Sequence, residues 1–268
     1  MIVFPNCKIN LGLHILRKRE DGFHDLETVF YPLPVRDGLE MISAPAMDFS
    51  QSGIAIPGDA ANNLCIQAYQ LLKADFPDLP AVRMHLHKVI PTGAGLGGGS
   101  ADGAFALQLL NTKYQLGLDD DQLEAYAARL GSDCPYFIRN RPSVGKGRGE
   151  ILEPVALDLS GYGFLLVHPG IHVNTGWAFG QLRPGAPDVG LEEIGWKDVA
   201  GWKGRLTNDF EGPVFTKYPE IAAIKERMYG AGALYASMSG SGSAVYGIFE
   251  AGKVPDLAWK DGYAVFKV

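Results

Sequence analysis

The chain has 268 residues, which is enough for one large domain or two smaller ones. Hydrophobic residues make up 47%, so a sizeable core can form. A net charge of −6 argues against a general nucleic-acid or membrane-surface binder, which needs a basic field. Three cysteines are too few for a disulfide framework and lack metal-ligand spacing, which indicates a reducing, cytoplasmic compartment. Neither a signal peptide nor an apolar run long enough to span a membrane is expected.

The first ninety residues are predicted to form mostly strands. These are expected at 2–4, 8–16, 23–30, 39–42 and 82–88, with a possible edge strand at 53–56. A helix over 64–74, capped by Asn62 or Asn63, precedes the last of them. Lys8 and Asn10 share a face of the second strand, because side chains two residues apart point the same way. On the residues alone, that face is expected to be solvated.

A glycine-rich stretch, PTGAGLGGGSA, follows the strand that ends at Lys88. Glycine loses the most backbone entropy on ordering, so the run is best explained by main-chain N–H groups that must approach a ligand. A helix that extends to Gly117, capped by Gly99 or Ser100, follows at once, and helix N-termini favour anions. The stretch is therefore predicted to bind phosphate, with a flexible linker as the weaker alternative. Its residues are Pro91, Thr92, Gly93, Ala94, Gly95, Leu96, Gly97, Gly98, Gly99, Ser100 and Ala101.

Three other glycine loops fit this stretch poorly. Gly93, Gly95 and Gly98 match G-x-G-x-x-G, but the strand and acidic residue of a dinucleotide-binding βαβ unit do not follow, because a second helix comes next. A P-loop requires lysine where Gly99 stands. The downstream signatures of a protein kinase are also missing from the sequence.

The middle of the chain continues with a helix from Asp119 to Gly131, in which Gln122 completes a capping box. Asp133 follows in a tight turn, where an aspartate taken alone is more simply a turn former. Residues 143–149, SVGKGRG, are expected to form a basic glycine-rich loop.

A domain boundary is expected near Pro154. Further strands are expected at 151–157, 164–167, 234–238, 244–249 and 263–268, and helices at 175–182, within 208–229 and just before the last strand. This order indicates an α+β second domain of the split βαβ kind. The SGSGS segment at 239–243 is either a plain hairpin turn or a second place where backbone approaches a phosphate, and residues 183–205 show no clear pattern.

The glycine-rich stretch resembles the Pro-x-Gly-x-Gly-Leu-Gly-x-Ser-[Ser/Ala] loop of galactokinase, homoserine kinase, mevalonate kinase and phosphomevalonate kinase, with one extra glycine. The early lysine strand, the GSDCP turn and the SGSGS turn follow that superfamily's order across nearly the whole chain. Four segments further resemble the 4-diphosphocytidyl-2-C-methyl-D-erythritol kinase family. They are NCKINLGL at 6–13, DGFHDLETVF at 21–30, GSDCPYF at 131–137 and VHPGIHVNTGWAF at 167–179.

The resemblance implies an α+β fold of two domains. An N-terminal ATP-binding kinase domain of mixed β-sheet and helices is expected over 1–154, and a ferredoxin-like C-terminal domain over 155–268. It implies an ATP-dependent kinase of the non-mevalonate route to isoprenoids and terpenoids, which phosphorylates the 2-hydroxyl of 4-diphosphocytidyl-2-C-methylerythritol. ATP and Mg²⁺ are the implied cofactors and a small cytidine diphosphate compound the substrate, with no nucleic-acid or membrane partner. Metal ligands and oligomeric state stay open.

The resemblance also implies roles in phosphoryl transfer. Asp133 would be the general base and Lys8 would neutralise charge on the γ-phosphoryl group. Residues 91–101 would hold the ATP phosphates, with Ser100 reaching Mg²⁺. Asn63 and Lys88 match positions that approach the nucleotide.

Substrate contacts are implied for five more residues. Phe23 and Phe179 would sandwich the cytosine, and His24 would supply the hydrogen bonds that select it. Asn10 would orient the methylerythritol, and Thr175 would contact the diphosphate. Where this chain departs from the family pattern, most substitutions replace one small residue by another. The other departure is Phe23, where the family has tyrosine.

Two other functions stay open at this point. One is a sibling kinase of the superfamily that acts on homoserine, mevalonate or a sugar. The other is a non-catalytic nucleotide- or RNA-binding module, which the acidic net charge disfavours.

Overall fold

The computed structural model describes residues 1–268, except the side chain of Ala60. The chain divides into two compact units, each described by itself below. Unit 1 comprises Met1–Lys8, Pro32–Thr92 and Gly97–Arg141, and unit 2 comprises Ile9–Tyr31, Gly93–Leu96 and Pro142–Val268. The units are interleaved in sequence, so the single boundary expected at 154–155 does not separate them: residues 9–31 and 93–96 group with the C-terminal half.

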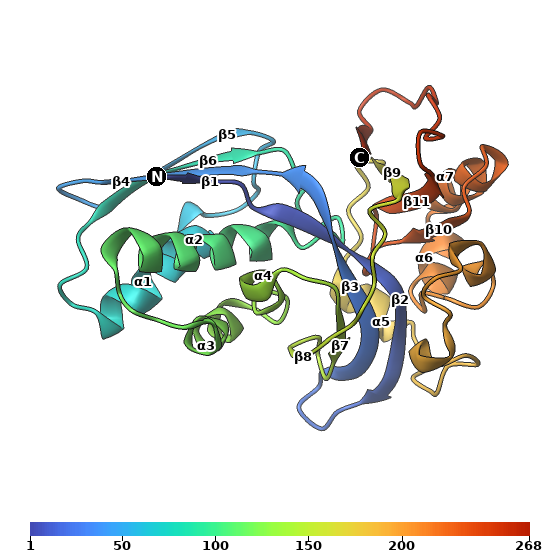
Figure 1. Ribbon diagram of the computed structural model, residues 1–268, viewed down its shortest axis with the longest axis horizontal. Coiled ribbons are helices and arrows are strands. Elements are labelled where there is room, and N and C mark those ends of the chain that lie inside the picture. The colour runs from blue at the N-terminus through green and yellow to red at the C-terminus, as the bar shows by residue number, and fades with distance from the viewer. The chain divides into compact units, whose positions relative to one another are not determined.

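Unit 1 contains a four-stranded sheet with two long helices against one face (Figure 1). The strand order is β1 (Ile2–Val3), β4 (Gly38–Ser43), β6 (Val82–Lys88) and β5 (Asp48–Gly53). Only β5 pairs in parallel, and it lies a few residues before the edge strand expected at 53–56. The helices are α1 (Leu64–Asp75), α2 (Gly98–Tyr114), α3 (Asp120–Leu130) and α4 (Tyr136–Arg139), with a short 3₁₀ turn, η1 (Ala60–Asn62).

The helix caps in unit 1 follow the sequence signals except at α2. The Asn63 side chain accepts a hydrogen bond from the Cys65 N–H and caps α1, as expected. Asp119 and Gln122 form the expected capping box of α3. The N-cap of α2 is Gly97 rather than Gly99 or Ser100, and its φ of 69° lies in the left-handed region that favours glycine.

Unit 2 contains an antiparallel sheet in the order β10 (Tyr235–Met238), β11 (Val245–Glu250), β9 (Tyr162–His168) and β12 (Ala264–Lys267). The helices α6 (Glu211–Lys217) and α7 (Pro219–Gly230) pack near it, and Ile224 and Met228 of α7 share a buried core with Leu165 and Val167 of β9 (Figure 1). This strand order is that of the split βαβ, ferredoxin-like arrangement. The helix expected just before the last strand is wrong, since residues 251–263 form turns and irregular backbone.

A third sheet has the order β2 (Asn6–Lys18), β3 (His24–Arg36), β7 (Ser143–Lys146) and β8 (Ile151–Pro154). Both β2 and β3 supply residues to each unit. The prediction of a solvated face on β2 is wrong, because Lys8 is only 4% exposed and Asn10 only 2% exposed. Half of the expected basic loop at 143–149 is the strand β7.

The segment at 183–205, which shows no pattern in the sequence, contains two short 3₁₀ turns. They are η2 (Leu191–Glu193) and η3 (Val199–Trp202), and a short helix, α5 (Thr175–Gly180), precedes them. Trp196 packs edge-on against the buried Trp202. Within the part of the chain that the structure describes, every helix is too short or too polar to cross a membrane. The expected α+β class is confirmed.

Replacing Gly97 by alanine tests the left-handed N-cap of α2. The new Cβ would lie 2.9 Å from the Phe137 ring and 3.1 Å from the Lys8 side chain, in a backbone conformation that costs an L-residue about 1–2 kcal/mol. We expect Gly97→Ala to lower the free energy of unfolding, measured by chemical denaturation, by at least about 1–2 kcal/mol.

Gly99→Ala is the matched control for that substitution. Gly99 lies inside α2, and no heavy atom beyond its own helix and its chain neighbours lies within 4 Å of an added Cβ. Alanine should therefore raise the free energy of unfolding by up to about 1 kcal/mol through helix propensity. Equal effects of the two substitutions would contradict the assignment of Gly97 as the cap.

Candidate active site

In unit 1 the structure brings together the two residues predicted to take part in phosphoryl transfer. The ammonium nitrogen of Lys8 lies 3.4 Å from a carboxylate oxygen of Asp133. The Lys8 side chain is 5% exposed and the Asp133 side chain 34% exposed. A buried cation thus faces a carboxylate that solvent, or a ligand, can still reach. This is the geometry expected of a base held beside a positive charge.

The glycine-rich loop passes directly beside this pair. A Cβ on Gly97 would be 3.1 Å from the Lys8 stem, so the main chain of the loop and the lysine are in contact. In the first turn of α2, the Ser100 hydroxyl lies near enough to the sulfur of Cys134, the residue after Asp133, to lower the pKa of that thiol. The first turn of α2 and the turn that carries Asp133 therefore lie close together within the same unit.

Cys134 is a packing residue rather than a nucleophile. Burial raises the pKa of its thiol to about 12, and the nearby Ser100 hydroxyl offsets only part of that rise. A thiol with that pKa is protonated near neutral pH and lacks the reactivity of a thiolate. The sulfur lies 3.5 Å from where a Cβ on Gly131 would be, which is an ordinary van der Waals separation.

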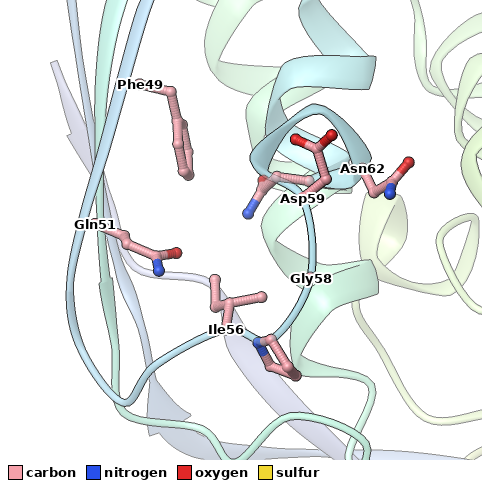
Figure 2. Close-up of a pocket in the computed structure, with 8 residues that line it drawn as sticks. Phe49, Gln51, Ile56, Gly58, Asp59 and Asn62 are labelled. Carbon is pink, nitrogen blue, oxygen red and sulfur yellow. The ribbon is translucent and has the colours of Figure 1, made fainter.

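A hollow of about 220 Å³ lies beside the start of α1 in unit 1 (Figure 2). Its lining combines an aromatic and two aliphatic side chains with amides and one carboxylate. The residues are Phe49, Gln51, Ile56, Pro57, Gly58, Asp59, Asn62 and Asn63. Asn63, predicted to approach the nucleotide, thus borders the hollow while its side chain caps α1. The hollow itself was not foreseen, because its walls come from a turn-rich stretch without periodicity.

Lys88, predicted to match a position that approaches the nucleotide, is engaged within the protein. Its side chain is completely buried, and its ammonium group is paired with Asp37 and lies 2.8 Å from an oxygen of Asp102. Its approach to a nucleotide stays a prediction. Burial raises the pKa of Asp102 to about 7, the Lys88 ammonium opposes that rise, and Asp37 adds to it. Sequence reasoning missed both acids, because neither lies in a recognisable ligand pattern.

In unit 2 the centre of the glycine-rich loop packs on the SGSGS turn. A Cβ on Gly95 would lie 2.0 Å from the Ser239 carbonyl oxygen, which no side chain could occupy. The Ser239 hydroxyl donates to the Gly95 carbonyl at 2.8 Å, and the Ala244 N–H donates to the Ala94 carbonyl at 3.1 Å. The segment is the hairpin turn between the antiparallel strands β10 and β11, the simpler of its two readings, and it also packs on the loop. Its approach to a phosphate stays a prediction.

Asn10 lies in a buried polar group of unit 2. Its side-chain amide donates to the Thr28 hydroxyl at 3.0 Å, and its main-chain carbonyl oxygen accepts from the Tyr246 hydroxyl at 2.8 Å. Its main-chain N–H donates to the Ser239 hydroxyl at 3.2 Å. Ser239 therefore links Asn10 to the glycine-rich loop. These contacts hold the Asn10 amide in a fixed orientation.

The residues predicted to hold cytosine lie in unit 2 but are arranged differently from the expected sandwich. His24 stacks on Phe179, with ring centroids 4.8 Å apart and an angle of 17° between the planes. Phe23 is 52% exposed and carries the Arg148 guanidinium over its ring at 4.8 Å. Phe179 also meets Phe210 edge-on. Arg148 was not singled out from the sequence, although it belongs to the basic SVGKGRG segment.

Two further features of unit 2 are the charge state of His24 and the surroundings of the Thr175 hydroxyl. Burial lowers the pKa of His24, and the positive charge of Lys18 lowers it further, which keeps the imidazole neutral near pH 7. Thr175, predicted to contact the diphosphate, is the first residue of α5. Its hydroxyl lies 3.0 Å from the hydroxyl of Ser241 in the SGSGS turn. Both hydroxyls belong to segments singled out in the sequence.

The donor set suits a nucleotide-bound Mg²⁺ rather than a metal held by the protein alone. Within the described residues, no group of three or more His, Cys, Asp or Glu side chains could hold a metal ion. Mg²⁺ in kinases is bound through one or two protein oxygen ligands together with the phosphates, so a dedicated cage is not required. The Ser100 hydroxyl, in the first turn of α2, fits such a set.

Comparison with known proteins identifies the family. Residues 63–141 match the model of the GHMP kinases N-terminal domain, and residues 192–258 match the model of the GHMP kinases C-terminal domain. The 4-diphosphocytidyl-2-C-methyl-D-erythritol kinase of Bacteroides fragilis is 52% identical over 93% of this chain and 92% of its own length. That of Bacteroides thetaiotaomicron is 50% identical over 100% of this chain and 99% of its own length.

Solved structures agree with these matches. A crystal structure of 4-(cytidine 5'-diphospho)-2C-methyl-D-erythritol kinase superposes with a TM-score of 0.79 and 34% identity, over 92% of this chain and 90% of the other. A mevalonate kinase structure has a TM-score of 0.63 at 13% identity, over 94% of this chain and 92% of the other, which shows a shared fold. The chain belongs to the 4-diphosphocytidyl-2-C-methyl-D-erythritol kinase family of the GHMP kinases.

Proposed function

We propose that this chain transfers the γ-phosphoryl group of ATP to the 2-hydroxyl of 4-diphosphocytidyl-2-C-methylerythritol, in the non-mevalonate route to isoprenoids. The observation that carries the proposal is the Lys8–Asp133 ion pair, which lies beside Gly97 and the first turn of α2 in unit 1. A carboxylate, a cation and an anion-binding helix start are what transfer of a phosphoryl group to an alcohol needs. The named relatives in the family support the same activity.

The chemical step depends on positioning and charge, because the protein takes little covalent part in phosphoryl transfer. Asp133 accepts the proton of the attacking hydroxyl as that oxygen bonds to the γ-phosphorus. The bond between the γ-phosphorus and the β–γ bridging oxygen breaks at the same time, and ADP leaves. Lys8, held within 3.4 Å of Asp133, neutralises negative charge that builds up on the phosphoryl oxygens. Main-chain N–H groups of the loop at 91–101 and of the first turn of α2 bind the triphosphate.

Mg²⁺ is proposed as the cofactor that accompanies ATP. Ser100 would hold it together with the phosphate oxygens, as its hydroxyl oxygen allows, while the Asp133 carboxylate stays available for the proton. When bound, the ion supplies positive charge that offsets the charge of the triphosphate. The chain's own residues still determine where the hydroxyl and its proton go.

The hollow beside α1 is the proposed site of the adenine base (Figure 2). Phe49 and Ile56 offer apolar walls to a flat base, and Gln51 and Asn62 offer amides at its edges. Asn63 borders the same hollow, which supports its predicted place near the nucleotide.

The cytidine part of the substrate is proposed to bind at the aromatic residues of unit 2. A base inserted between Phe23 and Phe179 would have to displace His24 from its stacked position on Phe179, which frees the imidazole for hydrogen bonds to the base. Arg148 over Phe23 adds a cation near the diphosphate. Thr175 contacts the diphosphate, and Asn10, fixed by its buried partners, orients the methylerythritol.

A cytoplasmic location is proposed along with this function. All three cysteines are free and buried, as is common where thiols stay reduced. ATP and phosphorylated intermediates of central metabolism are available in that compartment.

An acceptor panel tests the proposed function. The purified chain is mixed with Mg-ATP and, in separate reactions, with 4-diphosphocytidyl-2-C-methylerythritol, homoserine, mevalonate or galactose. We expect ADP to form only with the cytidine compound, because the other three acceptors have no aromatic base to stack between the aromatic side chains. ADP formation with one of the other alcohols would establish a sibling activity, and none with any acceptor would refute a kinase.

Asp133→Asn tests the general base. The amide keeps the size of the side chain but cannot accept the proton, so kcat should fall by about 10²- to 10⁴-fold while both substrates still bind. Steady-state kinetics and calorimetric titration measure the two effects. The matched control is Asp78→Asn in an exposed turn of the same unit, which should leave kcat unchanged. Turnover of the Asp133 variant within about tenfold of wild type would rule out the base role.

His24→Ala tests the cytosine contact. Removing a contact made equally in the ground and transition states should raise KM for the cytidine substrate about tenfold and leave KM for ATP unchanged. His87→Ala, an exposed histidine on β6, is the control and should change neither constant. A change in KM for ATP alone would show that His24 does not contact the cytidine substrate.

The pH dependence of the same constant gives a second readout for His24. Because its pKa is lowered, the imidazole is neutral at pH 7 and becomes charged only below the usual range near pH 6.5. KM for the cytidine substrate should therefore stay constant near and above neutral pH and rise only below the usual histidine range. The His24→Ala variant should lose this rise.

A further inference from the structure

Lys88, Asp37 and Asp102 form a buried charged cluster in unit 1 that the proposed chemistry does not use. The side chains of Lys88 and Asp37 are fully buried and that of Asp102 is 4% exposed. The single ammonium group of Lys88 donates hydrogen bonds to both carboxylates. Removing three charged groups from water is costly, and well-packed apolar residues of similar volume often stabilise a fold as well or better. Stability alone is therefore a poor reason for this cluster.

Asp102 also has a carboxylate oxygen that receives no hydrogen bond in the described structure. Its Oδ1 atom is buried without a hydrogen-bond partner, while its Oδ2 atom receives the Lys88 ammonium. An unsatisfied buried acceptor lowers stability. The carboxylate is thus placed for something other than the best packing of α2.

The cluster holds the chain on both sides of the glycine-rich loop. Before the loop, the Oδ1 atom of Asp37 accepts hydrogen bonds from the main-chain N–H groups of Val89 and Ile90, at 2.6 and 2.9 Å. After the loop, Asp102 lies in the early part of α2, which begins at Gly98. The Lys88 ammonium bridges the two acids, so one cation connects the entrance of the loop to its exit.

The same ammonium lies directly beneath the start of the helix. An added Cβ on Gly98 would come within 3.3 Å of the Lys88 nitrogen. The glycines themselves cannot hold the loop in place, because they lack side chains and have the largest backbone entropy to lose. The Ser239 hydroxyl and the Ala244 N–H hold the centre of the loop within unit 2. Anchors at the two ends limit the remaining loss before a ligand binds.

We propose that Lys88, Asp37 and Asp102 are positioning residues that pre-organise the glycine-rich loop for the phosphates of ATP. They act through the backbone of residues 89–102 and touch neither substrate. The proposal rests on the proposed function, in which this loop binds ATP. It predicts that damage to the cluster weakens ATP binding far more than acceptor binding.

Three variants of the full-length chain test this. Lys88→Met and Asp102→Ala break the cluster, and Leu79→Ala removes a buried side chain just before β6, at the opposite end of the strand from Lys88. KM for ATP should rise at least about tenfold in the first two while KM for the cytidine substrate stays within about threefold of wild type. Leu79→Ala should lower the melting temperature without separating the two constants.

Asp102→Asn provides rescue by a conservative change. The amide oxygen can still accept from Lys88 and the shape is kept, so KM for ATP should return to within about threefold of wild type. Hydrogen exchange of the amides at 93–101 without ATP gives a readout independent of catalysis. It should quicken in Asp102→Ala but not in Asp102→Asn or Leu79→Ala. If Lys88→Met does not fold, the two Asp102 variants decide the question.

Two results would overturn the proposal. One is an unchanged KM for ATP and unchanged loop exchange in folded Asp102→Ala, and the other is a parallel rise of both KM values, as general destabilisation would give. Calorimetric titration of the wild-type chain with a non-hydrolysable ATP analogue separates this from failure of the proposed function. A wild-type chain that binds no analogue refutes the function itself, whereas normal wild-type binding with unaffected variants refutes only the role of the cluster.

Discussion

The glycine-rich loop can come so close to its neighbours only because it lacks side chains. A Cβ would meet the Ser239 carbonyl at 2.0 Å on Gly95, and the Phe137 ring at 2.9 Å on Gly97. Within unit 1 this close approach puts the loop backbone against Lys8, which in turn faces Asp133 at 3.4 Å. Under the proposed function, phosphate binding and proton transfer share one set of contacts, and a side chain at Gly97 would disturb both.

Much of this organisation could be predicted from the sequence. The alternating periodicity predicted the strands β2, β6, β9 and β11 nearly in place. Local capping chemistry predicted the Asn63 cap and the Asp119–Gln122 capping box. Both kinds of signal depend on residues only a few positions apart. Motif resemblance then connected Lys8 with Asp133, which are 125 positions apart in the chain and paired in the structure. The fold class followed from the order of elements.

What the sequence could not supply depends on long-range packing. The burial of Lys88 is set by Asp37 and Asp102, which come from two other parts of the chain. The stacking of His24 on Phe179 is likewise a tertiary contact between distant segments. The cap at Gly97 depends on a left-handed conformation that any of three consecutive glycines could adopt, and the interleaving of the units depends on which segments pack together. None of these leaves a local signal.

The central claim is that the amides of the loop at 91–101 hold the triphosphate beside Lys8 and Asp133. The most direct measurement is a crystal structure of the chain with Mg²⁺ and a non-hydrolysable ATP analogue. We predict that the phosphate oxygens accept hydrogen bonds from the loop amides, and that the γ-phosphorus lies next to the Lys8 ammonium with room for one hydroxyl before the Asp133 carboxylate. A triphosphate bound away from the loop, or a γ-phosphorus remote from both side chains, would contradict the account.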